Sequence, residues 1–180
     1  MASILNVDQI NNAAGTSAIT VNSSGRVTMA NTVEIDQWNL SATFSTNNAT
    51  ITGWERPDHG FSAYAGTGMT ESSGVFTFPS TGLWKVSGSF LITAASGDTS
   101  CGFITQVSSD SGSNYTQIGG VFESQSQNTS GSFASLINVT NASTFRFKLQ
   151  SSGLNSGSSV SGNTSVDYSA LMFERITDSQ

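Results

Sequence analysis

Apolar and polar residues alternate with a period of two along several stretches of this chain. In the segment 144–150, three apolar residues of one parity alternate with two cations of the other. This alternation is typical of a β-strand with one face in a core and the other in water. The segments 82–93 and 133–139 also place most large apolar residues on one parity, with Leu136 on the other. We therefore expect each of these segments to form a strand.

The segment 166–173 carries apolar residues at both parities, unlike the other predicted strands. A strand that is apolar on both faces is usually buried on both. Such burial occurs either in a central strand that is covered on both sides or at a contact between subunits. Both interpretations apply to this segment.

Clusters of Gly, Ser, Asn and Asp separate the predicted strands, at 95–100, 108–114, 124–131 and 151–164. Charged residues make up only 10% of the chain, and no segment shows a convincing helical period. Short strands joined by such turns predict an all-β sandwich or jelly roll over 37–180. By parity and spacing, the residues that we expect to be largely buried are Trp38, Phe76, Phe78, Trp84, Phe90, Phe145, Phe147, Leu149, Leu171 and Phe173.

Residues 1–36 form a separate N-terminal arm in this interpretation. Short apolar pieces at 4–10, 18–21 and 26–29 are interrupted by Asn- and Gly-containing breaks, and 22–25 suits the turn of a hairpin. Strands this short bury too few apolar residues to fold alone. The arm must therefore pair with its own domain, with sister chains or with another protein.

The charge distribution disfavours two classes of partner. The net charge is −6, and the six basic residues are scattered singly, whereas nucleic-acid binding needs clustered cations. No apolar run approaches the length of a membrane span, and the N-terminus lacks the features of a signal peptide. We expect a soluble protein that is made in a cytoplasm, binds no nucleic acid and does not insert into a membrane.

Few side chains are suited to catalysis. The lone His59 lies in a turn-like stretch, and no G-x-S-x-G elbow accompanies it, so it is interpreted as a surface or interface residue. Glu55 and Asp58 are the nearest carboxylate pair for glycoside cleavage. The alternative is that these acids are solvated or paired with Arg56. We expect no catalytic residue and no enzyme.

Metal and sugar binding have weak signals. The segment 110–114 offers alternating oxygen ligands that suit calcium, but it lacks the closing acids of an EF-hand and also suits an Asx-type turn. The single cysteine, Cys101, forms neither an internal disulfide nor a zinc site with one histidine, and is expected to be buried. We expect no cofactor. Trp54, Tyr64 and Tyr115, in or beside loops, could stack on sugars.

The segment 74–90, GVFTFPSTGLWKVSGSF, resembles the C1q/TNF-like jelly roll. In that family a strand ending in Phe-x-x-Pro is followed by a turn with Gly and by an aromatic residue that opens a long core strand. The segments 144–150 and 168–173 look like the family's last two strands, and the resemblance covers roughly 37–180. It departs from the family in the first strand and in the polar loops, so no ligand is implied. The resemblance implies a homotrimer, and the residues expected near its threefold axis are Ala170, Leu171, Met172 and Phe173.

The arm resembles the start of fibre and other structural proteins of bacteriophages, especially marine ones, through 4–15 and 24–28. The segment 54–58, WERPD, is similar to C1q-like domains encoded by such phages. Together they imply a virion structural protein, as a tail fibre, fibre adaptor or capsid spike, whose head contacts a host-surface glycan or protein. The arm would join other virion proteins through Ile4, Leu5, Val7, Ile10, Ile19 and Val21. The alternatives are a free lectin-like carbohydrate-binding module and a glycan-degrading tailspike-type enzyme.

Overall fold

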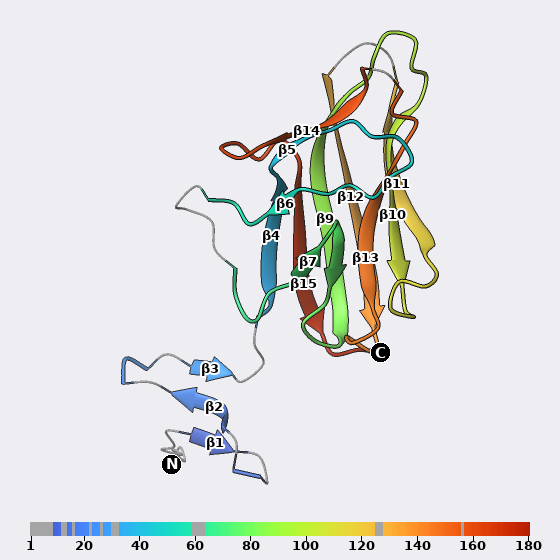
Figure 1. Cartoon of the computed structure of the whole chain (residues 1–180). Coiled ribbons are helices and arrows are strands. Elements are labelled where there is room, and N and C mark those ends of the chain that lie inside the picture. Colours follow the sequence, from blue (N-terminus) through green and yellow to red (C-terminus); the bar gives the residue numbers. More distant parts are fainter. Residues whose placement is uncertain are drawn as a thin grey trace, which may run out of the picture. The chain divides into compact units, whose positions relative to one another are not determined.

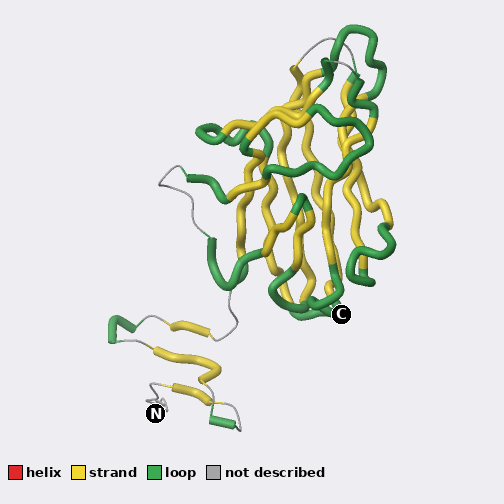
Figure 2. Tube along the Cα trace, in the orientation of Figure 1, coloured by secondary structure: helices red, strands yellow, loops and turns green. Residues whose placement is uncertain are grey.

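The computed structural model describes residues 9–11, 14–15, 17–21, 23–25, 27–29, 33–58, 64–124, 128–155 and 157–180. The chain divides into two compact units, Met1–Val33 and Glu34–Gln180. All regular structure in the described residues is β-strand (Figure 2). Within these residues, no helix is long and apolar enough to cross a membrane.

The smaller unit contains a three-stranded antiparallel sheet, in the order β1 (Gln9–Asn11), β2 (Ser17–Val21) and β3 (Val27–Met29). The hairpin expected around 22–25 is confirmed, because β2 pairs with β3 across a turn in which Gly25 has a φ of 77°. The arm's short strands thus pair with one another. Among the residues predicted to attach the arm, Ile10 is exposed, and Ile19 and Val21 are half-buried. Ile4, Leu5 and Val7 lie outside the described residues.

The larger unit is a sandwich of two antiparallel sheets (Figure 1). The larger sheet contains β12 (Asn128–Val139), β9 (Gly82–Thr93), β15 (Ala170–Thr177), β4 (Ile35–Leu40), β6 (Trp54–Glu55), β14 (Ser159–Asn163) and β5 (Ala42–Phe44). The second sheet contains, in order, β11 (Thr116–Glu123), β10 (Cys101–Ser108), β13 (Arg146–Ser152), β8 (Val75–Thr77) and β7 (Thr70–Ser72).

Aromatic rings from both sheets fill the space between them. Phe76 is central, with ring centroids 5.4 Å from Trp38, 6.0 Å from Trp54 and 5.0 Å from Phe173. All the residues expected to be buried are buried except Phe145. Phe145 comes just before β13 begins and is half-buried at the rim of the core. Parity therefore located the core.

The last strand is shorter than the apolar run that predicted it. β15 begins at Ala170, and Val166 and Tyr168 lie in the preceding loop with about half of their surface exposed. β15 is a central strand, paired with β9 on one side and β4 on the other. Leu171 and Phe173 point into the chain's own core and are fully buried. Their side chains are therefore not available to a neighbouring subunit.

The start of the head also differs from the expected boundary at residue 37. β4 begins at Ile35, and the backbone oxygen of Glu34 accepts a hydrogen bond of 2.9 Å from the backbone nitrogen of Arg175. Asp36 is buried in the larger unit. The segment 34–36 thus belongs to the sandwich rather than to the arm.

Candidate interaction surfaces

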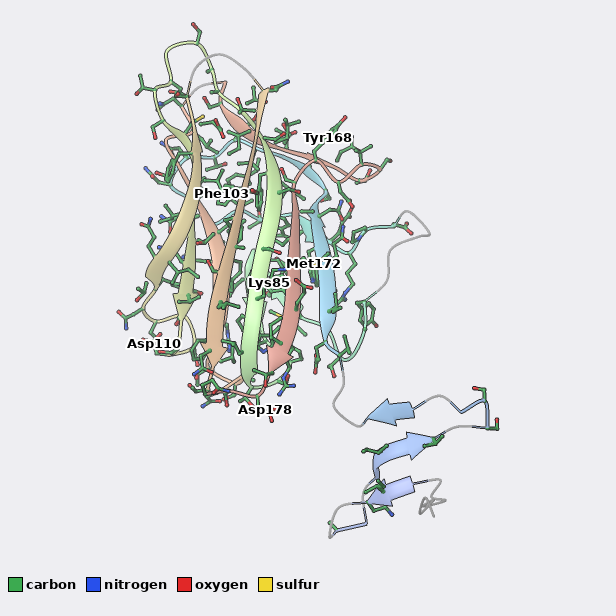
Figure 3. All side chains as sticks on the ribbon, turned by 180° about the vertical axis from the view of Figure 1, so that it is seen from behind. Lys85, Phe103, Asp110, Tyr168, Met172 and Asp178 are labelled. Atoms are coloured by element: carbon green, nitrogen blue, oxygen red, sulfur yellow. The ribbon has the colours of Figure 1, made fainter. Side chains whose placement is uncertain are left out.

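The outer face of the larger sheet is lined by small side chains. The strand register places Met172, Ser87 and Ala134 in one row, and Ala170, Ser89 and Ser132 in the next. A groove of about 420 Å³ runs over these rows, and Phe133 and Gln37 also line it. Figure 3 views this side, with Lys85 and Met172 labelled on adjacent strands. Small side chains allow another protein surface to approach this sheet closely.

The charged and amide groups on this outer face are paired within the chain. Lys85 Nζ lies 2.7 Å from Glu174 Oε2. Gln37 Nε2 donates a hydrogen bond of 2.9 Å to Asp167 Oδ2. Burying an unpaired charge is costly. Because these groups already have partners within the chain, a second protein surface can cover them without leaving a buried charge unpaired.

A second surface lies at the edge where β11 and β12 come together. Val107, Ile118, Leu136 and Phe145 line a groove of about 460 Å³ there. Leu136 is 66% exposed and Ile118 is 38% exposed. Within the described residues β12 pairs only with β9, so its other backbone edge is also free. We call this surface the apolar edge. An exposed apolar groove beside a free strand edge indicates a contact surface.

The prediction that Trp54 contacts sugars is wrong. Its side chain is 6% exposed, and its ring lies 6.0 Å from that of Phe76 and 6.4 Å from that of Phe90. Its indole nitrogen donates a hydrogen bond of 2.8 Å to the Ile51 backbone oxygen. Trp54 is a core residue because β6 joins the larger sheet by pairing with β4, which turns the indole into the space between the two sheets.

Tyr64 is exposed, but its ring is part of a cluster that begins at Asp36. The carboxylate of Asp36 accepts hydrogen bonds of 3.0 and 2.8 Å from Arg56 Nε and Nη2. The Arg56 guanidinium lies between two rings, 4.6 Å from the centroid of Trp38 and 4.5 Å from that of Tyr64. The hydrogen bonds to Asp36 are the main reason that the pKa of Arg56 is raised. Arg56 therefore pairs with Asp36 and not with its neighbours Glu55 and Asp58. The predicted boundary assigned Asp36 to the arm.

Glu55 and Asp58 share a cleft of about 390 Å³ with the hydroxyl groups of Thr164 and Ser165. Glycoside cleavage needs two carboxylates that flank a bound sugar at a defined separation, so a shared cleft alone does not establish it. His59 lies outside the described residues. Across the part of the chain that the structure describes, no three His, Cys, Asp or Glu side chains are grouped to hold a metal ion.

The loop between β10 and β11 is organised around Asp110. Asp110 Oδ1 accepts hydrogen bonds from Ser108 Oγ, at 2.6 Å, and from the Asn114 backbone nitrogen, at 2.9 Å. Asp110 Oδ2 accepts a hydrogen bond of 2.7 Å from Asn114 Nδ2. These hydrogen bonds lower the pKa of Asp110 to about 2, and the bond from Ser108 has the largest effect. The oxygens that a calcium ion would use serve the loop itself, as in an Asx-type turn.

Tyr115, the third predicted sugar contact, follows this loop and is half-buried. Its ring packs on a cation of the second sheet, since Lys148 Nζ lies 4.0 Å from the ring centroid. The alternation along 144–150 predicts that Arg146 and Lys148 lie on the water-facing side of their strand, but it does not point to Tyr115. No sequence signal links the two, because the contact joins β13 to the start of β11 across β10.

Comparisons with known proteins establish the fold. No family model and no curated protein sequence matches the chain. The structure is similar to that of Eiger TNF from S. frugiperda, with a TM-score of 0.63 and 12% identity over 83% of this chain and 96% of that chain. It is also similar to murine APRIL crystallised at pH 8.5, with a TM-score of 0.60 and 10% identity over 80% of this chain and 99% of that chain. The predicted C1q/TNF-like jelly-roll fold is therefore confirmed.

Proposed function

We propose that this chain is a bacteriophage virion protein, as a tail fibre, fibre adaptor or capsid spike. In this proposal it is a homotrimer without enzymatic activity, its arm joins other virion proteins, and its head contacts the host surface. The phage origin is supported by the resemblance of 4–15, 24–28 and 54–58 to phage proteins. The assembly is supported by the surfaces of the head.

The main support for the proposed trimer is that one head has two different contact surfaces. The outer face of the larger sheet includes Ala170 and Met172, and the apolar edge includes Ile118 and Leu136. When the edge of one subunit packs on the face of the next, each added subunit leaves one surface of each kind uncovered. Such head-to-tail contacts end only when a ring closes. The resemblance to C1q/TNF-like proteins supports a ring of three.

The arm supports attachment to a larger particle. Its sheet has three strands, two of them only three residues long, and a sheet of three strands is stable alone in water only with a hydrophobic face to bury. Within its described residues, β1 and β3 are the outer strands of that sheet. Outer strands can accept a further strand from a neighbouring protein.

Deletion of residues 1–33 tests the proposal. The deletion ends before Glu34, because Glu34 bonds to Arg175 and Ile35 begins β4. We expect the shortened protein to fold and to form trimers, yet to be missing from purified virions. As a matched control, the full chain with Val33→Glu keeps the arm and should be incorporated normally.

Normal incorporation of the shortened protein would overturn the role of the arm. If the full chain is absent from purified virions and accumulates free in lysates, the proposed virion function fails and the lectin-like alternative is favoured. Both results are read by immunoblotting of purified particles and of the remaining lysate.

A further inference from the structure

The positive charges of the head are unevenly satisfied. Three cations are in ion pairs with carboxylates, namely Arg56 with Asp36, Lys85 with Glu174, and Arg175 with Asp178. Arg146 and Lys148 have no carboxylate within ion-pairing distance among the described residues. These two lie two positions apart on β13, so their side chains leave the same face of the second sheet.

Polar and aromatic groups surround these two cations. In the strand register, Lys148 lies opposite Gln106 of β10, and Gln106 lies opposite Gln117 of β11. The Gln106 Oε1 atom is shielded from solvent and has no hydrogen-bond partner within the described structure. Tyr115 covers Lys148, with the ammonium 4.0 Å from its ring centroid. We call Arg146, Lys148, Tyr115 and Gln106 the cationic site.

The groups of the cationic site are partly removed from water, and the negative charge that acts on Tyr115 is that of Asp110, whose carboxylate is bound within its own loop. Burial lowers the pKa of Lys148, as expected for an ammonium partly removed from water. Burial raises the pKa of Tyr115, and the charge of Arg146 acts against this increase. Arg146 Nη1 donates to the adjacent Phe145 backbone oxygen at 2.7 Å, and a guanidinium has five N–H donors in all. A partly desolvated cation pair beside an unsatisfied acceptor is completed by a ligand that carries both a negative charge and a hydroxyl group.

We propose that the cationic site binds an acidic saccharide, through the carboxylate of a uronic-acid-type sugar in a host-surface polysaccharide. The planar Arg146 guanidinium can hold a carboxylate with two parallel hydrogen bonds, and Lys148 adds a second positive charge. Gln106 Oε1 is shielded in the unbound chain, so it accepts a hydrogen bond from a sugar hydroxyl once the amide turns outward on binding. The proposal rests on the proposed function, in which the head faces the host, and it names the class of glycan and the surface.

Nucleic acid is a poorer ligand for the same surface. Two cations neutralise few phosphates, and the chain as a whole carries a charge of −6. A uronic-acid sugar carries one carboxylate, which Arg146 and Lys148 can bind together. The same sugar carries neutral hydroxyl groups, which can bond to the amides of Gln106 and Gln117. An acidic polysaccharide supplies both chemistries.

Binding of the purified full chain to polysaccharides tests this proposal by titration calorimetry. The probes are two carboxylated polymers, alginate and polygalacturonate, with dextran as the neutral polymer and dextran sulfate as the sulfated one. We expect the carboxylated polymers to bind and dextran not to bind. Arg146→Gln and Lys148→Gln should each weaken binding by about tenfold or more, because each removes a charge-assisted contact.

Two variants serve as matched controls. Lys148→Arg keeps the positive charge and should retain binding. Thr99→Glu changes the net charge by the same amount as Lys148→Gln, in an exposed loop at the other end of β10 from Arg146. It should bind like the unaltered chain, because the proposed contact is local and does not depend on net charge.

Three results would overturn the proposal. The first is no binding to either carboxylated polymer. The second is equal weakening by Thr99→Glu and Lys148→Gln. The third is tighter binding of dextran sulfate than of the carboxylated polymers through the same two cations, which would assign a sulfate ligand. Virions that carry Lys148→Gln should still contain the protein, so failure at this site is distinguishable from failure of the virion function.

Discussion

Four hydrogen bonds converge on the buried carboxylate of Asp36. They come from Arg56 Nε and Nη2, from Trp38 Nε1 at 3.0 Å and from the Met69 backbone nitrogen at 2.7 Å. Together they hold Arg56 and the backbone of Met69 against β4. This one side chain therefore connects segments that are far apart in sequence.

Asp36→Ala should lower the free energy of unfolding by about 3–5 kcal/mol, because it leaves donors from three residues without their buried acceptor. Asp36→Asn keeps one acceptor oxygen and should cost less. Urea denaturation of the head measures both changes. Asp58→Ala, at an exposed position, is the control and should change stability by less than about 0.5 kcal/mol. A loss below about 1 kcal/mol for Asp36→Ala would contradict the role given to this carboxylate.

At the scale of elements, the β10–β11 hairpin depends on its loop. Asp110 bonds to Ser108 and Asn114, and Ser111 and Gly112 within the loop have positive φ values of 64° and 90°. Figure 3 shows Asp110 in this loop, away from the labelled residues of the larger sheet. The loop positions Tyr115 over Lys148, so the hairpin supports the cationic site.

The titration of Asp110 tests this element. Its pKa in the folded chain is about 2, below the value of about 3.9 of an unfolded aspartate. Its contribution to stability is therefore present above about pH 4 and is lost as the pH falls toward 2. Carboxyl NMR shifts should give a midpoint near 2 for Asp110. Asn114→Ala should raise that midpoint, since it removes a side-chain donor. A midpoint near 4 in the unaltered chain would contradict the hydrogen-bonded loop.

At the scale of the whole molecule, the two contact surfaces determine assembly. Leu136→Glu places a charge in the apolar edge, where Leu136 is 66% exposed in the isolated chain. Burying that charge against a second subunit should cost about 3 kcal/mol or more, which is about a hundredfold in the association constant. Light scattering should show a trimer for the unaltered chain and a monomer for the variant. The far-ultraviolet circular dichroism should be unchanged.

Val33→Glu is the control for this assembly experiment, because Val33 is 61% exposed and lies in no strand. The control should remain trimeric. A stable monomer of the unaltered chain at micromolar concentration would contradict the trimer itself. A trimer that persists in Leu136→Glu would show that the subunits do not contact one another through the apolar edge.

The local alternation of side chains predicted which residues point inward. Successive side chains of a strand leave opposite faces, so 82–93, 133–139 and 144–150 revealed their buried side without knowledge of any pairing. The Phe-Pro-Gly segment at 74–90 likewise predicted the jelly roll, which structural similarity confirmed. These features depend on residues that are close in sequence.

Contacts between distant segments decided the rest. Trp54 looked like a loop residue, and only the pairing of β6 with β4 turns it into the core. In the same way, only pairing on both sides of β15 shows that Leu171 is covered by its own chain, while Met172 remains on the outer face. The alternation of apolar and polar residues shows which side chains share a face of a strand. The element that covers each face comes from elsewhere in the chain. The long-range packing therefore determined which apolar residues form the core and which ones are left for a partner.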